Sequence, residues 1–173
     1  AEVRSAGVEE GDLEWFLRDR RYDVDRAYAK LKRVAAFRRE YAWKVKEKDV
    51  AAEMASGKSR VHTGMATRGR PVLVVNVAKH VTNEFPLEMT KQLVALQVQQ
   101  AVDRLGPGDE TIMTIIDMRG FSLRNADIKF VKFLVDVFFI YYPRRMSELL
   151  LVSPPPIFRP TWAVVKPLLR KYA

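Results

Sequence analysis

Residues 72–77 read Val-Leu-Val-Val-Asn-Val, and residues 111–117 read Thr-Ile-Met-Thr-Ile-Ile-Asp. Each segment is a nearly continuous run of β-branched and aliphatic side chains, without the alternation that marks a strand with one face in water. Residues 149–152, Leu-Leu-Leu-Val, form a third such run. These three segments predict strands that are covered on both faces, as in a mainly parallel sheet.

Helical patterns separate the predicted strands. Pro86 suits the first turn of a helix that runs to about Leu105, where residues 106–108 (Gly-Pro-Gly) end it. An apolar helix over residues 128–141 stands between the second and third strands, and a last helix surrounds residues 162–169. The alternation of strands and helices predicts parallel strands joined by helical crossovers.

The first sixty residues are helical in pattern. Ala27, Leu31 and Val34 recur at helical spacing behind a cap at Asp23 or Asp25. The sequence therefore predicts an α/β fold, with a mainly parallel sheet and flanking helices, preceded by an all-helical N-terminal segment. The predicted division is a helical segment over residues 1–60 and an α/β domain over residues 61–173.

The residues that support common catalytic sites are missing from the sequence. The chain has no cysteine, which excludes disulfides and thiolate metal ligands, and only two histidines, His62 and His80. We expect both histidines to be surface or capping residues, and Asp117 to pair with loop amides or with Arg119. The phosphate-binding patterns G-x-x-x-x-G-K-[ST] and G-x-G-x-x-G do not occur, nor does G-x-S-x-G. We therefore expect no catalytic residues, no metal and no cofactor.

The charge of the chain permits an anionic partner. Thirty Lys and Arg residues stand against 21 Asp and Glu, a formal net charge of +9. Nucleic acid and the phosphates of a membrane surface both suit that balance. We expect no nucleic-acid partner, because the basic residues do not alternate with aromatic residues as in a base-stacking surface.

No apolar run is long enough to cross a bilayer. The nearest candidate, residues 126–142, is interrupted by Lys129, Lys132 and Asp136. A buried amphipathic helix is the expected structure of this segment. The sequence thus predicts a soluble protein that associates with membranes peripherally, without crossing them.

Several phrases resemble one known family, in one order along about residues 13–172. They are the opening WFLRDRRYDVDRA (15–27), the pair Phe37-Arg38, the entry GRPV (69–72), the loop IDMRGFS (116–122), the turn YYPRRM (141–146) and the ending SPPPIF (153–158), followed by Trp162 and KPLL (166–169). Together they resemble the CRAL-TRIO family, which includes phosphatidylinositol-transfer, tocopherol-transfer and retinal-binding proteins. The wording of residues 121–130 is most similar to the small plastid members of plants and algae.

The resemblance implies a sheet floor and helical walls that enclose one hydrophobic ligand. It implies transfer or presentation of that ligand at membranes, with no enzymatic activity. The ligand would be a phospholipid, such as phosphatidic acid or phosphatidylinositol, or an isoprenoid such as a carotenoid or tocopherol. The expected lipid-pocket residues are Met113, Ile115, Phe130, Phe133, Leu134, Val137, Phe138, Tyr141, Leu151, Ile157 and Phe158. The alternative is a protein-interaction scaffold of the same fold with a vestigial pocket.

Two features depart from the family pattern. Phosphatidylinositol binders place a glutamate after Tyr-Tyr-Pro, where this chain has Arg144. A cation cannot replace that carboxylate, which weakens the case for an inositol headgroup and favours an anionic lipid phosphate instead. The family also continues after its last helix with a strand and a gate helix, so we expect a truncated chain. The expected headgroup or membrane contacts are Arg18, Arg20, Arg21, Arg144 and Arg145.

The resemblance also carries expectations about partners and place. A hydrophobic lipid ligand and an anionic membrane surface are the expected partners. We expect a monomer, unless the exposed sheet edge pairs with another chain. The expected location is intracellular and peripheral to membranes, in the chloroplast, with the cytoplasm as the alternative.

Overall fold

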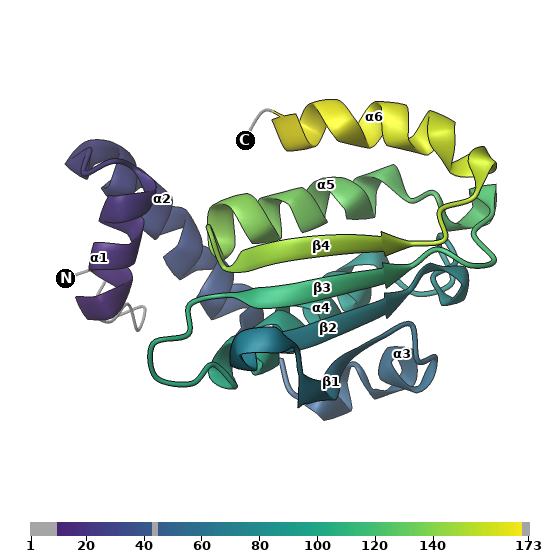
Figure 1. Ribbon diagram of the computed structural model, residues 1–173, viewed down its shortest axis with the longest axis horizontal. Helices are drawn as coiled ribbons and strands as arrows, with labels where there is room; N and C mark the ends of the chain where they lie inside the picture. The colour runs from purple at the N-terminus through teal and green to yellow at the C-terminus, as the bar shows by residue number, and fades with distance from the viewer. Residues whose placement is uncertain (1–9, 43–44, 171–173) are drawn as a thin grey trace.

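A four-stranded sheet lies at the centre of the molecule (Figure 1). The computed structural model describes residues 10–42 and 45–170. The strands, in spatial order, are β1 (Ser59–Met65), β2 (Pro71–Asn76), β3 (Ile112–Asp117) and β4 (Met146–Val152). Strands β2, β3 and β4 are parallel, and β1 is antiparallel to β2. The predicted α/β class with a mainly parallel sheet is confirmed.

Strand β1 was not predicted from the sequence. Its residues include Ser59, Arg60, Thr63 and Gly64, and most of its side chains are exposed. The strand lacks the apolar run that identifies the other three, because most of its side chains face solvent and need not be apolar. Backbone pairing with β2 between residues 59–61 and 73–75 holds it in place.

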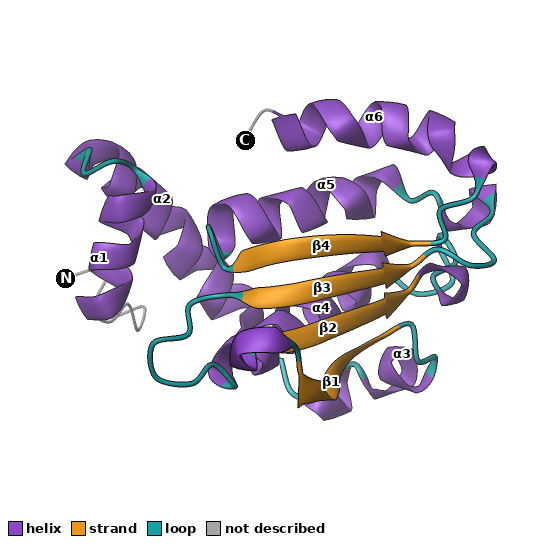
Figure 2. Ribbon diagram, in the orientation of Figure 1, coloured by secondary structure: helices purple, strands orange, loops and turns teal. Residues whose placement is uncertain are grey.

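Both crossover helices lie on one face of the sheet. Helix α4 (Leu87–Asp103) joins β2 to β3, and α5 (Ile128–Asp136) joins β3 to β4. The two crossovers step across the sheet in the same direction, and such connections are right-handed, so both helices fall on the same side. Figure 2 shows the strands in front and α4 behind them. The last helix, α6 (Arg159–Arg170), packs beside α5.

The opposite face of the sheet carries apolar side chains that no described helix or loop covers completely, so they are partly exposed to solvent. Leu150 and Val152 of β4 are exposed on it, at 44% and 38% of their full areas. Within the described chain, no strand pairs with the outer edge of β4. Whether this edge pairs with another chain stays a prediction.

The N-terminal helices form a hairpin beside the sheet. Trp15 and Phe16 of α1 (Glu10–Asp19) pack against Leu31 and Val34 of α2 (Val24–Phe37). The carboxylate of Asp23 caps α2 by accepting a hydrogen bond from the backbone N–H of Arg26. A short helix, α3 (Ala51–Ala55), leads into β1. This agrees with the predicted helical segment, although residues 1–9 lie outside the described residues. The boundary predicted at residue 60 falls within β1, and the division into two domains stays a prediction.

Candidate functional site

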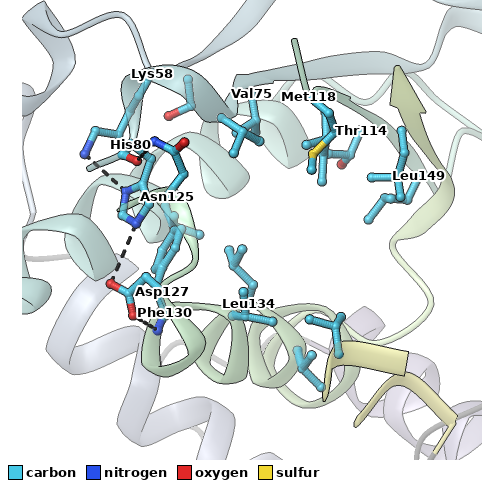
Figure 3. A pocket seen from close by; sticks show the side chains of 18 of the residues that line it. Lys58, Val75, His80, Thr114, Met118, Asn125, Asp127, Phe130, Leu134 and Leu149 are labelled. Atoms are coloured by element: carbon cyan, nitrogen blue, oxygen red, sulfur yellow. Dashed lines mark hydrogen bonds and ion pairs between the residues drawn. The ribbon is translucent and has the colours of Figure 1, made fainter. Parts of the chain in front are cut away.

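An apolar cavity lies between the helix-covered face of the sheet and helices α4, α5 and α6. Its volume is about 220 Å³. A site for a single water needs about 10–15 Å³, so the cavity is far larger than a one-water site. Figure 3 shows its lining side chains from the sheet and from α5 facing one another across this space.

The floor of the cavity consists of alternate residues of three strands. Leu73, Thr114 and Leu149 lie side by side in the register of β2, β3 and β4. One pleat further on, Val75, Ile116 and Leu151 form a second row. All six side chains line the cavity. Successive side chains of a strand point to opposite faces of the sheet, so only every second residue of each strand can belong to the floor.

Helix α5 forms the facing wall. Phe130, Leu134 and Phe138 line the cavity at the spacing of one helix face. A π-helical turn over residues 137–141 interrupts the α-helix after Asp136. The wider turn rotates the residues that follow, and the ring of Tyr141 stacks on Phe37 of α2, with centroids 4.0 Å apart.

Aromatic rings close the cavity beneath α6. Phe158 and Trp162 line it, with ring centroids 6.0 Å apart. Phe121, from the loop after β3, meets Phe158 edge to face at 5.3 Å. This wall is apolar, as an enclosure for a hydrocarbon chain requires.

Polar side chains gather at one end of the cavity, where β2 and β3 reach their carboxyl ends. We call this group the polar corner, and its members are Glu53, Lys58, His80, Thr90, Asn125 and Asp127. Lys58 Nζ lies 2.8 Å from Glu53 Oε1 and 3.5 Å from His80 Nδ1. Thr90 donates its hydroxyl hydrogen to the same oxygen of Glu53 at 2.6 Å. The corner therefore places one cation, two carboxylates and one imidazole beside an apolar chamber.

His80 is held from several sides. Asn125 donates a side-chain hydrogen bond to the backbone carbonyl of His80 at 2.7 Å. The ring lies 4.8 Å from that of Phe130, and its Nε2 lies 3.7 Å from Asp127 Oδ2 (Figure 3). Burial, reinforced by the Lys58 cation, lowers the pKa of His80, while Asp127 and Glu53 oppose that shift. The imidazole is therefore neutral at neutral pH.

Three buried polar atoms of this region have no hydrogen-bond partner in the structure. They are Glu53 Oε2, His80 Nε2 and Thr114 Oγ1. Buried polar groups normally have partners, because leaving one unpaired costs about 1–3 kcal/mol. His80 and Thr114 both line the cavity, so a polar group on a ligand is a natural partner for them.

The structure brings five of the predicted lipid-pocket residues to the cavity wall: Phe130, Leu134, Phe138, Leu151 and Phe158. Met113 and Ile115 lie on the opposite face of β3, because Thr114 and Ile116 supply the floor. Phe133 and Val137 pack in the core cluster around Phe37. Tyr141 is turned away by the π-helical turn, and Ile157 is 48% exposed. These last six residues do not line the cavity.

The predicted membrane-contact arginines fall into two groups. Arg18 and Arg145 lie over the ring of Trp15, at 5.1 and 4.0 Å from its centroid. Glu110 binds both, through its carboxylate to Arg18 at 3.2 Å and its backbone carbonyl to Arg145 at 3.0 Å. Trp15, Arg18 and Glu110 line a small cleft, and Arg144 lines it too. Arg20 pairs with Asp19, and Arg21 lies exposed in the turn after α1.

The remaining predictions concern Asp117 and the two histidines. Asp117 accepts hydrogen bonds from the backbone and guanidinium of Arg119, as expected, and that contact lowers the pKa of its carboxyl to about 2. His62 is exposed, as expected. His80 does not lie at the surface, since it is only 8% exposed beneath α5 and the segment before β1. It is a capping residue, the other expected role, because it ends the short 3-10 helix Val77–Lys79 and its backbone N–H donates to the carbonyl of Val77. No group of three or more metal-ligating side chains occurs in residues 10–42 and 45–170.

Sequence reasoning missed the polar corner as a whole. Lys58 contacts a glutamate five residues away and a histidine 22 residues away, and Thr90 meets Glu53 across 37 residues. None of these separations follows a helix or strand period, so no local pattern could have assembled the group.

Among the described helices, none is both long enough and apolar enough to cross a bilayer.

Comparisons with known proteins agree with this architecture. A phosphatidylinositol transfer protein, CSR1, from Eremothecium gossypii is 30% identical over 125 residues, which cover 72% of this chain and 28% of that protein. A human alpha-tocopherol transfer protein-like protein is 24% identical over 173 residues, covering 96% of this chain and 51% of its own length. The chain thus spans about a quarter to a half of these two relatives.

A solved structure and a family profile complete the comparison. The crystal structure of Sfh5 superposes with a TM-score of 0.71 at 14% identity, covering 91% of this chain and 60% of that one. The likeness shows a common fold. The profile of the CRAL/TRIO domain matches residues 56–173. This range includes all four strands of the sheet and the helices α4, α5 and α6. The chain therefore belongs to the CRAL/TRIO domain family.

Proposed function

We propose that the chain binds one hydrophobic lipid molecule in the cavity and transfers or presents it at a membrane surface. The observation that carries this proposal is the apolar chamber between the sheet floor and α5. Burying about 200–400 Å² of hydrocarbon there contributes on the order of 5–10 kcal/mol. The printed names of two relatives, a phosphatidylinositol transfer protein and an alpha-tocopherol transfer protein-like protein, support carriage of a lipid rather than catalysis.

The proposed membrane contact uses the exposed arginines. Within the described residues, Arg21 and Arg144 have no ion pair, whereas Arg18 and Arg20 are paired with carboxylates. Arg145 is engaged with Trp15 and the Glu110 carbonyl. An unpaired cation near an anionic bilayer contributes about 1 kcal/mol. Arg21 and Arg144 are thus the stronger candidates of the five.

The test is extraction of the purified protein with organic solvent, followed by lipid mass spectrometry and an absorption spectrum. The proposal expects a stoichiometric lipid, or uptake of one lipid per chain from vesicles. A visible absorption band would identify a carotenoid. No bound lipid and no uptake would instead favour a protein-interaction scaffold with a vestigial pocket.

The finer expectations rest on resemblance. A plastid location, and a carotenoid or phosphatidic acid as cargo, are proposals that follow from the wording of residues 121–130 and from Arg144. Arg144 lies at the amino end of β4, beside Trp15 and Arg18 and away from the polar corner. An anionic headgroup would therefore face the arginines rather than the corner.

A further inference from the structure

The unpaired Nε2 of His80 and the neighbouring carboxylate of Asp127 lie side by side at the polar end of the cavity. His80 is 8% exposed, and its Nε2 has no hydrogen-bond partner. The nearest acceptor, Asp127 Oδ2, lies 3.7 Å away, which is too far for a hydrogen bond. Both residues line the cavity, and Figure 3 shows them facing each other at its edge.

The contacts assign the proton of His80. An ammonium group only donates, so Lys58 Nζ, 3.5 Å from Nδ1, makes that nitrogen the acceptor. The neutral ring therefore carries its hydrogen on Nε2. The Asp127 Oδ1 atom accepts the backbone N–H of Phe130 at 2.9 Å, which leaves Oδ2 as an acceptor. A buried donor without a partner thus lies beside a carboxylate oxygen that can accept a hydrogen bond.

A hydroxyl is the group that satisfies both atoms at once. Its oxygen accepts from His80 Nε2–H while its hydrogen is donated to Asp127 Oδ2. An oxygen with two hydrogen bonds of about 2.8 Å at a tetrahedral angle holds its partners about 4.5 Å apart. The observed pair must therefore open by less than about 1 Å, within the reach of a side-chain rotation.

An anionic phosphate does not fit this end. Lys58 is the single cation of the polar corner, and it already contacts Glu53 Oε1, His80 Nδ1 and the face of Phe85, 4.9 Å from its centroid. A phosphate would meet the Asp127 carboxylate without a free cation to offset the repulsion. An ester carbonyl would accept from His80 but has no hydrogen to donate to Asp127.

Resting on the proposed function, we infer that the cargo is a lipid with a free hydroxyl, bound between His80 and Asp127 with its hydrocarbon chain along α5. The hydroxyl lies at the carboxyl ends of β2 and β3, and the chain runs over the sheet floor toward Leu149. The cavity selects an alcohol over an ether or a phosphate of the same chain length.

Three matched probes test this assignment: hexadecanol, hexadecyl methyl ether and hexadecyl phosphate, each in phosphatidylcholine vesicles. The protein is incubated with an equal mixture, separated from the vesicles and extracted, and the retained probes are quantified by mass spectrometry. We expect the alcohol to be retained over each of the others by about 10-fold or more. The alcohol alone can both donate to the Asp127 carboxylate and accept from the buried His80 N–H.

Two variants connect that preference to the pair. His80→Phe keeps a ring against Phe130 but removes the donor, so the alcohol-to-ether ratio falls toward one. Asp127→Asn keeps the cap of α5 and removes the charge, so exclusion of the phosphate weakens. His62→Phe, at an exposed histidine of β1, is the matched control and retains the preference.

The outcomes separate this inference from the proposed function. Equal retention of alcohol and ether by the wild-type chain would overturn the hydroxyl assignment, leave a trapped water as the partner of His80, and keep the carrier function intact. Retention of the phosphate at the level of the alcohol would overturn it as well. Retention of none of the three, together with no co-purified lipid, would end the carrier function itself.

Discussion

Lys58 and Glu53 form a buried ion pair. Glu53 is fully buried and Lys58 is 4% exposed, and their charged atoms lie 2.8 Å apart. The pair connects α3 to the segment before β1, and Thr90 adds α4 through its hydroxyl. Removing one partner of such a pair leaves an uncompensated buried charge, whereas removing both does not.

Lys58→Met is therefore expected to lower the free energy of unfolding by about 3–5 kcal/mol. The double variant Lys58→Met/Glu53→Leu should recover most of that loss, because no buried charge remains. Urea unfolding followed by circular dichroism measures both. Lys48→Met, at an exposed lysine, is the control and should change stability by less than about 0.5 kcal/mol. Equal stability of Lys58→Met and the wild type would show that the pair contributes nothing.

His80 makes stability depend on pH. Burial and the Lys58 cation lower its pKa in the folded protein, so the unfolded chain binds that proton more readily. The stability that neutral His80 contributes is complete above its unfolded pKa of about 6.5, and it is lost as pH falls from there toward the lower folded-state pKa.

Thermal unfolding from about pH 7 to pH 5 measures this contribution. The melting temperature of the wild type should fall more steeply over that range than that of His80→Gln, which has no proton to gain. His62→Gln should follow the wild type. Parallel curves for the wild type and His80→Gln would show that this histidine titrates alike in both states.

Residues of β3 show why the site was only partly predictable. The run over residues 111–117 identified the strand, but both of its faces carry apolar side chains, so the pattern did not say which face meets the cavity. Met113 and Ile115 were chosen for their apolar character, whereas Thr114 and Ile116 form the floor.

Helix α5 depends on its first and last turns for its position over the sheet. Asp127 caps its start by accepting the N–H of Phe130, and the π-helical turn over residues 137–141 ends it. The π-helical turn was not predicted, because a helical apolar pattern continues through it, and only the stacking of Tyr141 on Phe37 reveals the change of face.

The cap makes a specific prediction for this helix. Asp127→Ala should destabilise the protein by about 1 kcal/mol, because the N–H of Phe130 loses its partner. Asp127→Asn should cost only a few tenths of that, since asparagine caps equally well. Chemical unfolding compares the two variants. A loss with Asn as large as the loss with Ala would mean that the charge of Asp127, rather than its cap, sustains the fold.

The order of strands and helices explains where the cavity lies. Both crossovers place their helices on one side of the sheet, so the floor, α5 and the rings beneath α6 face one chamber. This arrangement was predictable from the alternation of apolar strands and helices. The polar corner was not, because it depends on contacts among α3, α4 and the segment before β1 that no sequence period encodes.

The whole account depends on a chamber that receives hydrocarbon, and a plug placed in it is the most direct test. Leu134→Trp fills the cavity from the middle of α5, whereas Lys132→Trp adds the same ring at an exposed position of that helix. The measurement is the amount of lipid that each folded variant retains after incubation with vesicles. We predict a loss of about 10-fold or more for Leu134→Trp, because overpacking an occupied site costs about 1–3 kcal/mol, and wild-type retention for Lys132→Trp. Undiminished lipid on a folded Leu134→Trp variant would contradict the account.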